Sequence, residues 1–135
     1  MKITVADFFT GFFSALALST DHQKRTFECG EHFNEALHAA YEKFSEAAEN
    51  AGLRLNFLIH LDPLHGDSRV IEEGIGGAIR RDLISLDNPN FEKVRLTIPI
   101  EEARENIESV LGGAELYQNL VAEFLKHFDS TPATS

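Results

Sequence analysis

The clearest pattern of hydrophobic and polar positions lies between about residues 28 and 50. Apolar residues recur there every three or four positions, and glutamates occupy most of the opposite face, as on an amphipathic helix. The apolar positions are Phe33, Ala36, Leu37, Ala40, Tyr41, Phe44, Ala47 and Ala48. Gly52 follows, and glycine adopts the left-handed conformation of a helix end at little steric cost. The pattern predicts a long helix that ends near residue 50.

A second helical pattern begins near the N-terminus. Thr4 and Asp7 form a weakened capping box, with Asp in the place of the usual Glu or Gln. Apolar residues then recur at helical spacing, at Val5, Phe8, Phe9, Phe12, Phe13 and Leu16. Four of the 11 phenylalanines lie in this segment, which is more aromatic surface than the edge helix of a small domain usually buries. The segment is therefore either ordinary core, a subunit interface or a pocket wall.

Two more helices are predicted after Pro99. Glu101 and Glu102 suit the first turn of a helix, and a pair of glycines at 112–113 ends it. Residues 114–128 repeat the helical pattern, with Leu116, Leu120, Val121, Phe124, Leu125 and Phe128 on one side. The sequence thus predicts a single domain over residues 1–128 and a flexible C-terminal tail over residues 129–135.

Strand-like patterns occupy the middle of the chain. Residues 53–61 alternate between apolar and polar and then become nearly continuously apolar, which is typical of a strand with a buried face. Residues 82–87 and 91–98 flank a turn-rich linker and predict a β-hairpin. Residues 69–79 fit a helix, a loop or a strand, because a cap at Asp67 or Ser68 favours a helix but three internal glycines each cost about 1 kcal/mol relative to alanine.

Helices in one run and strands in another indicate an α+β fold. We expect a small antiparallel sheet of about three strands, packed by about four helices in two layers. Such a sheet has two open edges, which dimers often cover, so we also expect a homo-oligomer and in the first place a dimer.

Charge and composition limit the classes of partner that we expect this protein to bind. The hydrophobic fraction of 43% and the charged fraction of 25% are ordinary for a soluble domain, and no run of 18 apolar residues is present. The net charge of −10 repels nucleic-acid phosphates and anionic lipids, so neither nucleic acid nor a membrane is an expected partner. Cys29 has no second cysteine to pair with, which favours the cytoplasm. Residues 2–18 faintly resemble a signal peptide, although Asp7 and the single Lys2 argue against one.

One group of polar residues could support metal binding or acid–base chemistry. His60, Asp62, His65 and Asp67 lie at the end of the predicted strand and in the loop after it, and they are ligand types that zinc, iron or manganese accept. If the site exists, one histidine is the base and one aspartate orients it. The alternative is ordinary turn chemistry around Asp-Pro and Gly-Asp-Ser.

A weaker group combines His22, Cys29 and His32. A structural zinc site needs four ligands, and the neighbouring Glu28 and Glu31 disfavour a reactive thiolate. We therefore expect no metal at this group. For the protein as a whole we expect no metal or other cofactor, with a metal site at residues 60–67 as the alternative.

The segment from Gly74 to Arg81 pairs glycines with two arginines. Arg80 and Arg81 could clamp an anion while glycine backbone approaches it closely, although no phosphate-loop motif is present. The alternative is that the glycines permit close packing.

The functional expectation is a small binding module, leaning away from an enzyme because no familiar catalytic motif occurs. Its pocket would hold an apolar or cationic small molecule against an aromatic wall of Phe9, Phe12, Phe13, Tyr41 and Phe44. One alternative is an acidic, inhibitor-like interaction protein that presents Glu35, Glu42, Glu46 and Glu49 to a basic partner. Another is an enzyme or metal site at residues 60–67.

Overall fold

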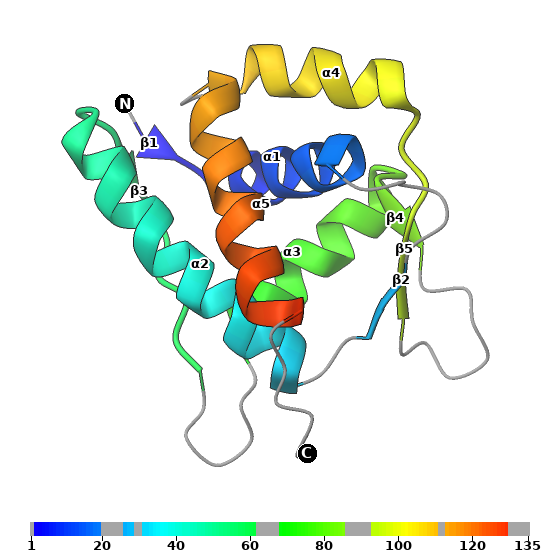
Figure 1. The fold of residues 1–135 in the computed structure, drawn as a ribbon, viewed down its shortest axis with the longest axis horizontal. Coiled ribbons are helices and arrows are strands. Elements are labelled where there is room, and N and C mark those ends of the chain that lie inside the picture. The colour runs from blue at the N-terminus through cyan, green and yellow to red at the C-terminus, as the bar shows by residue number, and fades with distance from the viewer. Residues whose placement is uncertain are drawn as a thin grey trace.

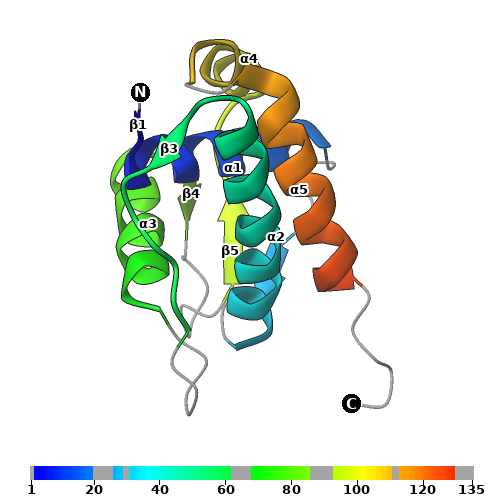
Figure 2. The same ribbon diagram turned by 90° about the vertical axis from the view of Figure 1, so that its left-hand side faces the viewer.

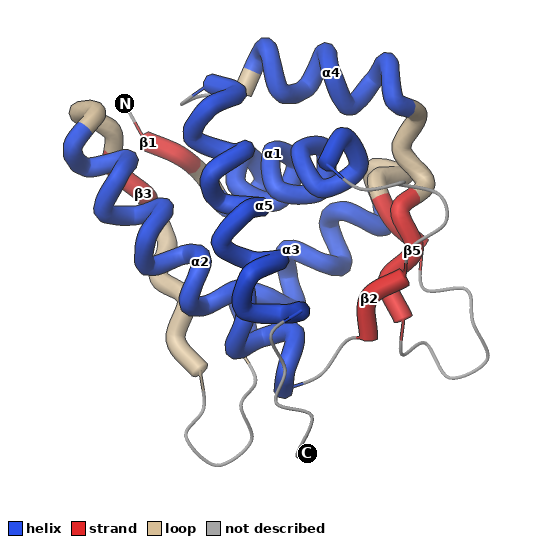
Figure 3. The backbone as a smooth tube through the Cα atoms, viewed as in Figure 1, coloured by secondary structure: helices blue, strands red, loops and turns tan. Residues whose placement is uncertain are grey.

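Helices form most of the structure. The computed structural model describes residues 2–19, 26–28, 31–61, 68–85, 93–110 and 113–129. Within these residues the helices are α1 (Val5–Ser19), α2 (Glu31–Asn50), α3 (Arg69–Arg80), α4 (Ile100–Ser109) and α5 (Gly113–Asp129). The strands are β1 (Lys2–Ile3), β2 (Thr26–Glu28), β3 (Arg54–Leu55), β4 (Ile84–Ser85) and β5 (Lys93–Leu96). Figure 3 shows how short the strands are beside the helices.

Helix α1 is the centre of the fold. It contacts α3, α4 and α5, and α2 packs along α5 (Figures 1 and 2). The capping box predicted at its start is present, since the Thr4 amide donates to the Asp7 carboxylate at 3.2 Å and the Asp7 amide donates to the Thr4 hydroxyl at 3.1 Å. Helix α1 is buried on nearly every side from Phe8 to Ala17, which explains why so many of its residues are aromatic or small.

Helix α3 forms despite its three glycines. The Ser68 hydroxyl caps it by accepting a hydrogen bond from the Ile71 amide at 3.2 Å, as one of the two predicted caps. Gly74 is buried against the ring of Phe9, and a Cβ atom at that position would overlap the ring. Close packing on α1 therefore offsets the low helix propensity of this glycine.

The predicted α+β fold is wrong. The protein is mainly helical, and its strands are two to four residues long in two small sheets rather than one layer of a two-layer structure. In one sheet β1 pairs with β3 in parallel, and in the other β5 lies between β2 and β4 with antiparallel pairing. The homo-oligomer expected from open sheet edges stays a prediction.

The alternating pattern at residues 53–61 has a different cause from the one inferred. Only Arg54 and Leu55 of this segment pair with another strand. The inward residues after them pack on helices instead, because the Phe57 ring lies 5.3 Å from the Phe8 ring and Ile59 is buried. An extended segment that lies on a helical surface acquires the same period-two pattern as a half-buried strand.

The C-terminal helix reaches one residue into the predicted tail. Asp129 is the last residue of α5, and residues 130–135 lie outside the described residues. None of the described helices has both the length and the apolar character needed to cross a membrane.

Tyr117 on α5 is a buried polar residue without a described partner. Its side chain has no exposed surface, and its hydroxyl finds no hydrogen bond among the described residues. Burial, with a smaller contribution from the Asp7 carboxylate, raises the pKa of the Tyr117 hydroxyl far above its ordinary range. An unsatisfied buried hydroxyl destabilises the folded state.

Tyr117→Phe is therefore expected to stabilise the protein by about 1 kcal/mol in urea unfolding at neutral pH. Tyr41→Phe is the matched control, because the Tyr41 hydroxyl is not left unsatisfied and the Ile59 backbone acts to lower its pKa against the effect of burial, so its removal should cost up to about 1 kcal/mol. Above about pH 10 the unfolded state loses the Tyr117 proton first, so wild-type stability should fall further than that of Tyr117→Phe. If Tyr117→Phe and Tyr41→Phe lowered the free energy of unfolding equally, the interpretation of the Tyr117 hydroxyl as unsatisfied would be contradicted.

Candidate functional site

The three phenylalanines predicted as pocket wall on α1 lie in the core. Phe9, Phe12 and Phe13 each have 0% exposure. The Phe12 ring packs edge-to-face on Phe124 of α5 at 5.0 Å, and Phe9 contacts Gly74 of α3. None of the three lines the grooves described below. Their role as a ligand wall stays a prediction.

Tyr41 and Phe44 lie on opposite sides of one ridge of α2. Tyr41 lines a groove between α2 and the segment that follows it, whereas Phe44 lines a second groove between α2 and α5. The Phe8 ring bridges them beneath the surface, at 6.3 Å from the Tyr41 ring and 5.1 Å from the Phe44 ring. The structure therefore brings these two predicted residues to one aromatic cluster but not to one pocket.

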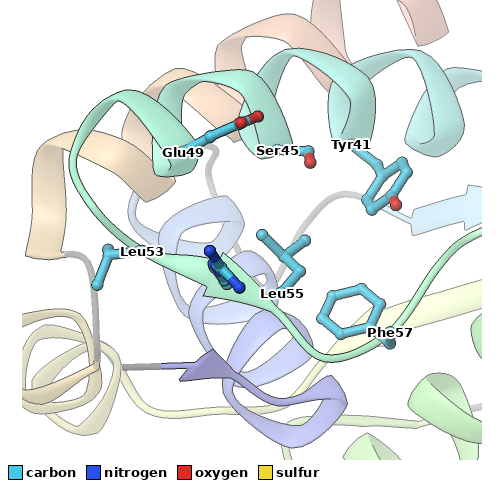
Figure 4. A pocket seen from close by; sticks show the side chains of 7 residues that line it. Tyr41, Ser45, Glu49, Leu53, Leu55 and Phe57 are labelled. Carbon is cyan, nitrogen blue, oxygen red and sulfur yellow. The ribbon is translucent and has the colours of Figure 1, made fainter.

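The groove beside Tyr41 is the best candidate site. It has a volume of about 360 Å³ and lies between α2 and the chain around β3 (Figure 4). Its lining residues are Tyr41, Ser45, Glu49, Leu53, Arg54, Leu55 and Phe57. In Figure 4, Tyr41 and Ser45 point from α2 toward β3 and the segment after it.

One end of this groove is aromatic. The rings of Tyr41 and Phe57 lie 6.1 Å apart, tilted by 39°. Tyr41 is almost wholly buried, and this burial raises the pKa of its hydroxyl despite the opposing hydrogen bond with the Ile59 backbone. Phe57 is half-buried, so part of its ring remains accessible. This end can accept an apolar group or stack a cation on a ring face.

The other end of the groove is charged. Glu49 and Arg54 are both exposed, and Ser45 is half-buried between the two ends. A carboxylate at the rim can pair with a cationic ligand, whereas the guanidinium of Arg54 opposes one. The groove therefore combines apolar side chains with one negative and one positive group, and a ligand could contact either of these groups without the other.

The groove around Phe44 is more uniformly apolar. It has a volume of about 290 Å³ and is lined by Lys43, Phe44, Ala47, Leu116, Asn119, Leu120, Ala122 and Glu123. Its two charged residues lie on different helices, Lys43 on α2 and Glu123 on α5.

The predicted histidine sites are only partly described. His60 is exposed, while Asp62, His65 and Asp67 lie outside the described residues, as do His22 and Cys29. Among the described residues, no group of three or more His, Cys, Asp or Glu side chains could hold a metal ion. His32 has a structural contact, because its Nε2 lies 2.8 Å from the carbonyl oxygen of Phe128 and its ring packs on the Phe128 ring.

The two arginines predicted for an anion do line a hollow. Arg80 and Arg81 border a space of about 250 Å³ together with Gly74 and Gly77 of α3 and the first residues of α1.

Four predicted acidic positions, Glu35, Glu42, Glu46 and Glu49, are all exposed on α2. Of these, Glu42 pairs with His38 at 3.3 Å.

Most residues of the Tyr41 groove were not anticipated. Leu53, Leu55 and Phe57 belong to the apolar positions of the 53–61 pattern, which does indicate a covered face. What the pattern does not contain is the spacing between that segment and α2, which leaves the groove open. In comparisons with protein-family models, curated protein sequences and solved structures, no significant match to this chain was found, so the function proposed below depends on the geometry of this groove.

Proposed function

We propose that the protein is a small-molecule-binding module that holds an apolar or cationic ligand in the groove between α2 and β3. The observation that carries the proposal is the combination of an aromatic end, where the half-buried Phe57 lies beside the nearly buried Tyr41, and an exposed carboxylate, Glu49, in one groove of about 360 Å³. Ligand sites commonly combine apolar side chains with polar groups that orient the ligand, and this groove has both.

The chemistry of the lining favours a ligand with an apolar body and one positive charge. The body would lie on Leu55 and Phe57 at the aromatic end, and the positive charge would face Glu49 at the charged end. The net charge of −10 adds a long-range attraction for cations. Arg54 acts against the cation locally, so its removal should tighten binding.

The test uses two probes of the same shape, benzyltrimethylammonium and the uncharged neopentylbenzene, in NMR titrations of the labelled protein. Both should shift amide signals around Tyr41 and Phe57, and Phe57→Leu should weaken both. Glu49→Gln should weaken the charged probe about three- to fivefold and leave the neutral probe unchanged, since exposed charges contribute up to about 1 kcal/mol. Arg54→Gln should tighten only the charged probe.

Glu46→Gln is the matched control for this titration. Glu46 is also exposed on α2 and carries the same charge, but it does not line the groove. Equal weakening by Glu46→Gln and Glu49→Gln would mean that the probe senses only net charge. Absence of saturable shifts around Tyr41 with either probe would refute the proposal.

An acidic interaction protein is the second candidate. The observation that favours it is the exposure of all four carboxylates on α2. A basic protein surface bound there would dissociate steeply as the salt concentration rises, because exposed charges are screened over about 10 Å at 0.1 M salt. Binding of an apolar cation in the groove would depend on salt much less.

A further inference from the structure

A hollow outside the proposed groove lies between the start of α1 and the C-terminal half of α3. It has a volume of about 250 Å³, and its lining residues are Val5, Ala6, Glu73, Gly74, Gly77, Arg80 and Arg81. It shares no residue with the groove around Tyr41. Any ligand here would therefore be recognised independently of the proposed function.

The guanidinium groups of Arg80 and Arg81 converge over Gly77. A Cβ atom placed on Gly77 would lie 3.7 Å from Nη2 of Arg80 and 3.7 Å from Nη1 of Arg81. Both arginines thus fold back along α3 toward the same point, although consecutive residues on a helix point about 100° apart. Because glycine has no side chain, the space between the two groups and the backbone stays open.

This pair of positive charges has no described counter-ion. Within the described part of the chain, neither guanidinium group has a hydrogen bond or an ion pair. Glu73 lines the hollow, but its carboxylate is paired with Nε of Arg69 at 3.5 Å. In a chain with 22 acidic and 12 basic residues, two converging arginines without a carboxylate partner are unexpected. Their mutual repulsion is relieved when an anion lies between them.

We propose that Arg80 and Arg81 bind the phosphate group of a small phosphorylated molecule in this hollow. Two guanidinium forks offer several parallel N–H donors, which match the oxygens of a tetrahedral phosphate better than a single charge does. The hollow is small, with a volume of about 250 Å³, and the net charge of −10 repels the extended anionic surfaces of lipids and nucleic acids. A freely diffusing phosphate compound is therefore the source that fits.

The test is an NMR titration of the labelled protein with inorganic phosphate at neutral pH and constant ionic strength. Saturable shifts are expected at the amides of Ala6, Gly77 and Arg81. Arg80→Gln/Arg81→Gln should weaken phosphate binding at least about tenfold, as loss of two charge-assisted contacts implies. Gly77→Ala keeps both arginines but places a methyl group between them, and it should also weaken binding. Glu73→Gln should tighten it.

The matched control is Arg104→Gln/Lys126→Gln, which removes the same charge from exposed positions on α4 and α5 that do not line the hollow. Equal weakening by the two double variants would overturn the proposal, because phosphate affinity would then depend only on the net charge of the protein. Binding to phosphatidic acid vesicles without binding of free phosphate would overturn it as well. Benzyltrimethylammonium binding at the Tyr41 groove should be the same in Gly77→Ala and wild type, so failure of one site is distinguishable from failure of the other.

Discussion

Phe12→Ala is expected to destabilise the protein by about 4 kcal/mol, because it deletes a fully buried aromatic ring and leaves a cavity in the core. The Phe12 ring lies 5.0 Å from the rings of both Phe13 and Phe124, so its removal weakens the packing within α1 and between α1 and α5. Edge-to-face pairs of this kind add to the area that the ring buries. Urea unfolding monitored by circular dichroism gives the change in free energy.

The same variant distinguishes core from ligand wall. Phe128→Ala is the control, since Phe128 is half-buried near the same aromatic cluster, 5.3 Å from Phe124, and should cost about half as much. A Phe12→Ala protein that keeps wild-type stability would show that the ring is not part of the packed core. The prediction that α1 supplies a ligand wall would then gain support.

The helices were predictable where one face alone is buried. Helix α2 alternates apolar and acidic faces and ends at Asn50 before Gly52, whose φ of 82° is the left-handed conformation expected of it. Helix α1 was predictable as a helix but not as the centre of the fold. Its small residues Gly11 and Ser14 lie outside the apolar pattern, although both are buried, Gly11 against the Tyr117 ring and Ser14 beside Asn106.

The sheet was not predictable because alternation does not identify the surface that a segment covers. Leu55, Phe57 and Ile59 face inward as strand residues would, yet the surface beneath them is helical and aromatic. The grooves that the predicted site residues line could not be predicted for a related reason. Tyr41 and Phe44 are three residues apart on the apolar face of α2, and only the positions of α5 and β3 decide that they line different grooves. Long-range packing of this kind leaves no local pattern in one sequence.

Arg80 and Arg81 show the opposite case, in which local sequence was informative. Two arginines that follow glycines one turn away on a helix can fold back over bare backbone, and the structure places both beside Gly77. The pattern did not indicate that α1 would form the opposite wall through Val5 and Ala6. The sequence thus indicated that the two arginines could lie close to glycine backbone, but it did not indicate that α1 would border the same hollow.

Gly74→Ala and Gly76→Ala are expected to change stability in opposite directions, although both replace a glycine inside α3. Alanine favours a helix interior by about 1 kcal/mol over glycine, and at Gly76 the nearest neighbour of a new Cβ is Nη1 of Arg80 at 3.5 Å, an ordinary contact with a flexible side chain. Gly76→Ala should therefore stabilise by up to about 1 kcal/mol. At Gly74 the new Cβ overlaps the ring of Phe9, which is fully buried and cannot move away, so Gly74→Ala should destabilise by about 3 kcal/mol.

A double-mutant cycle tests whether the Phe9 ring is the cause. Phe9→Leu alone should cost stability, because it removes buried aromatic surface, but it also vacates space beside Gly74. The double variant Gly74→Ala/Phe9→Leu should then be more stable than the sum of the single effects predicts, with a coupling of about 1–2 kcal/mol. Additive effects would mean that α3 does not pack on α1 through this contact. Positive coupling at Gly74 together with a stabilising Gly76→Ala would establish that one glycine is required for helix packing and the other is not.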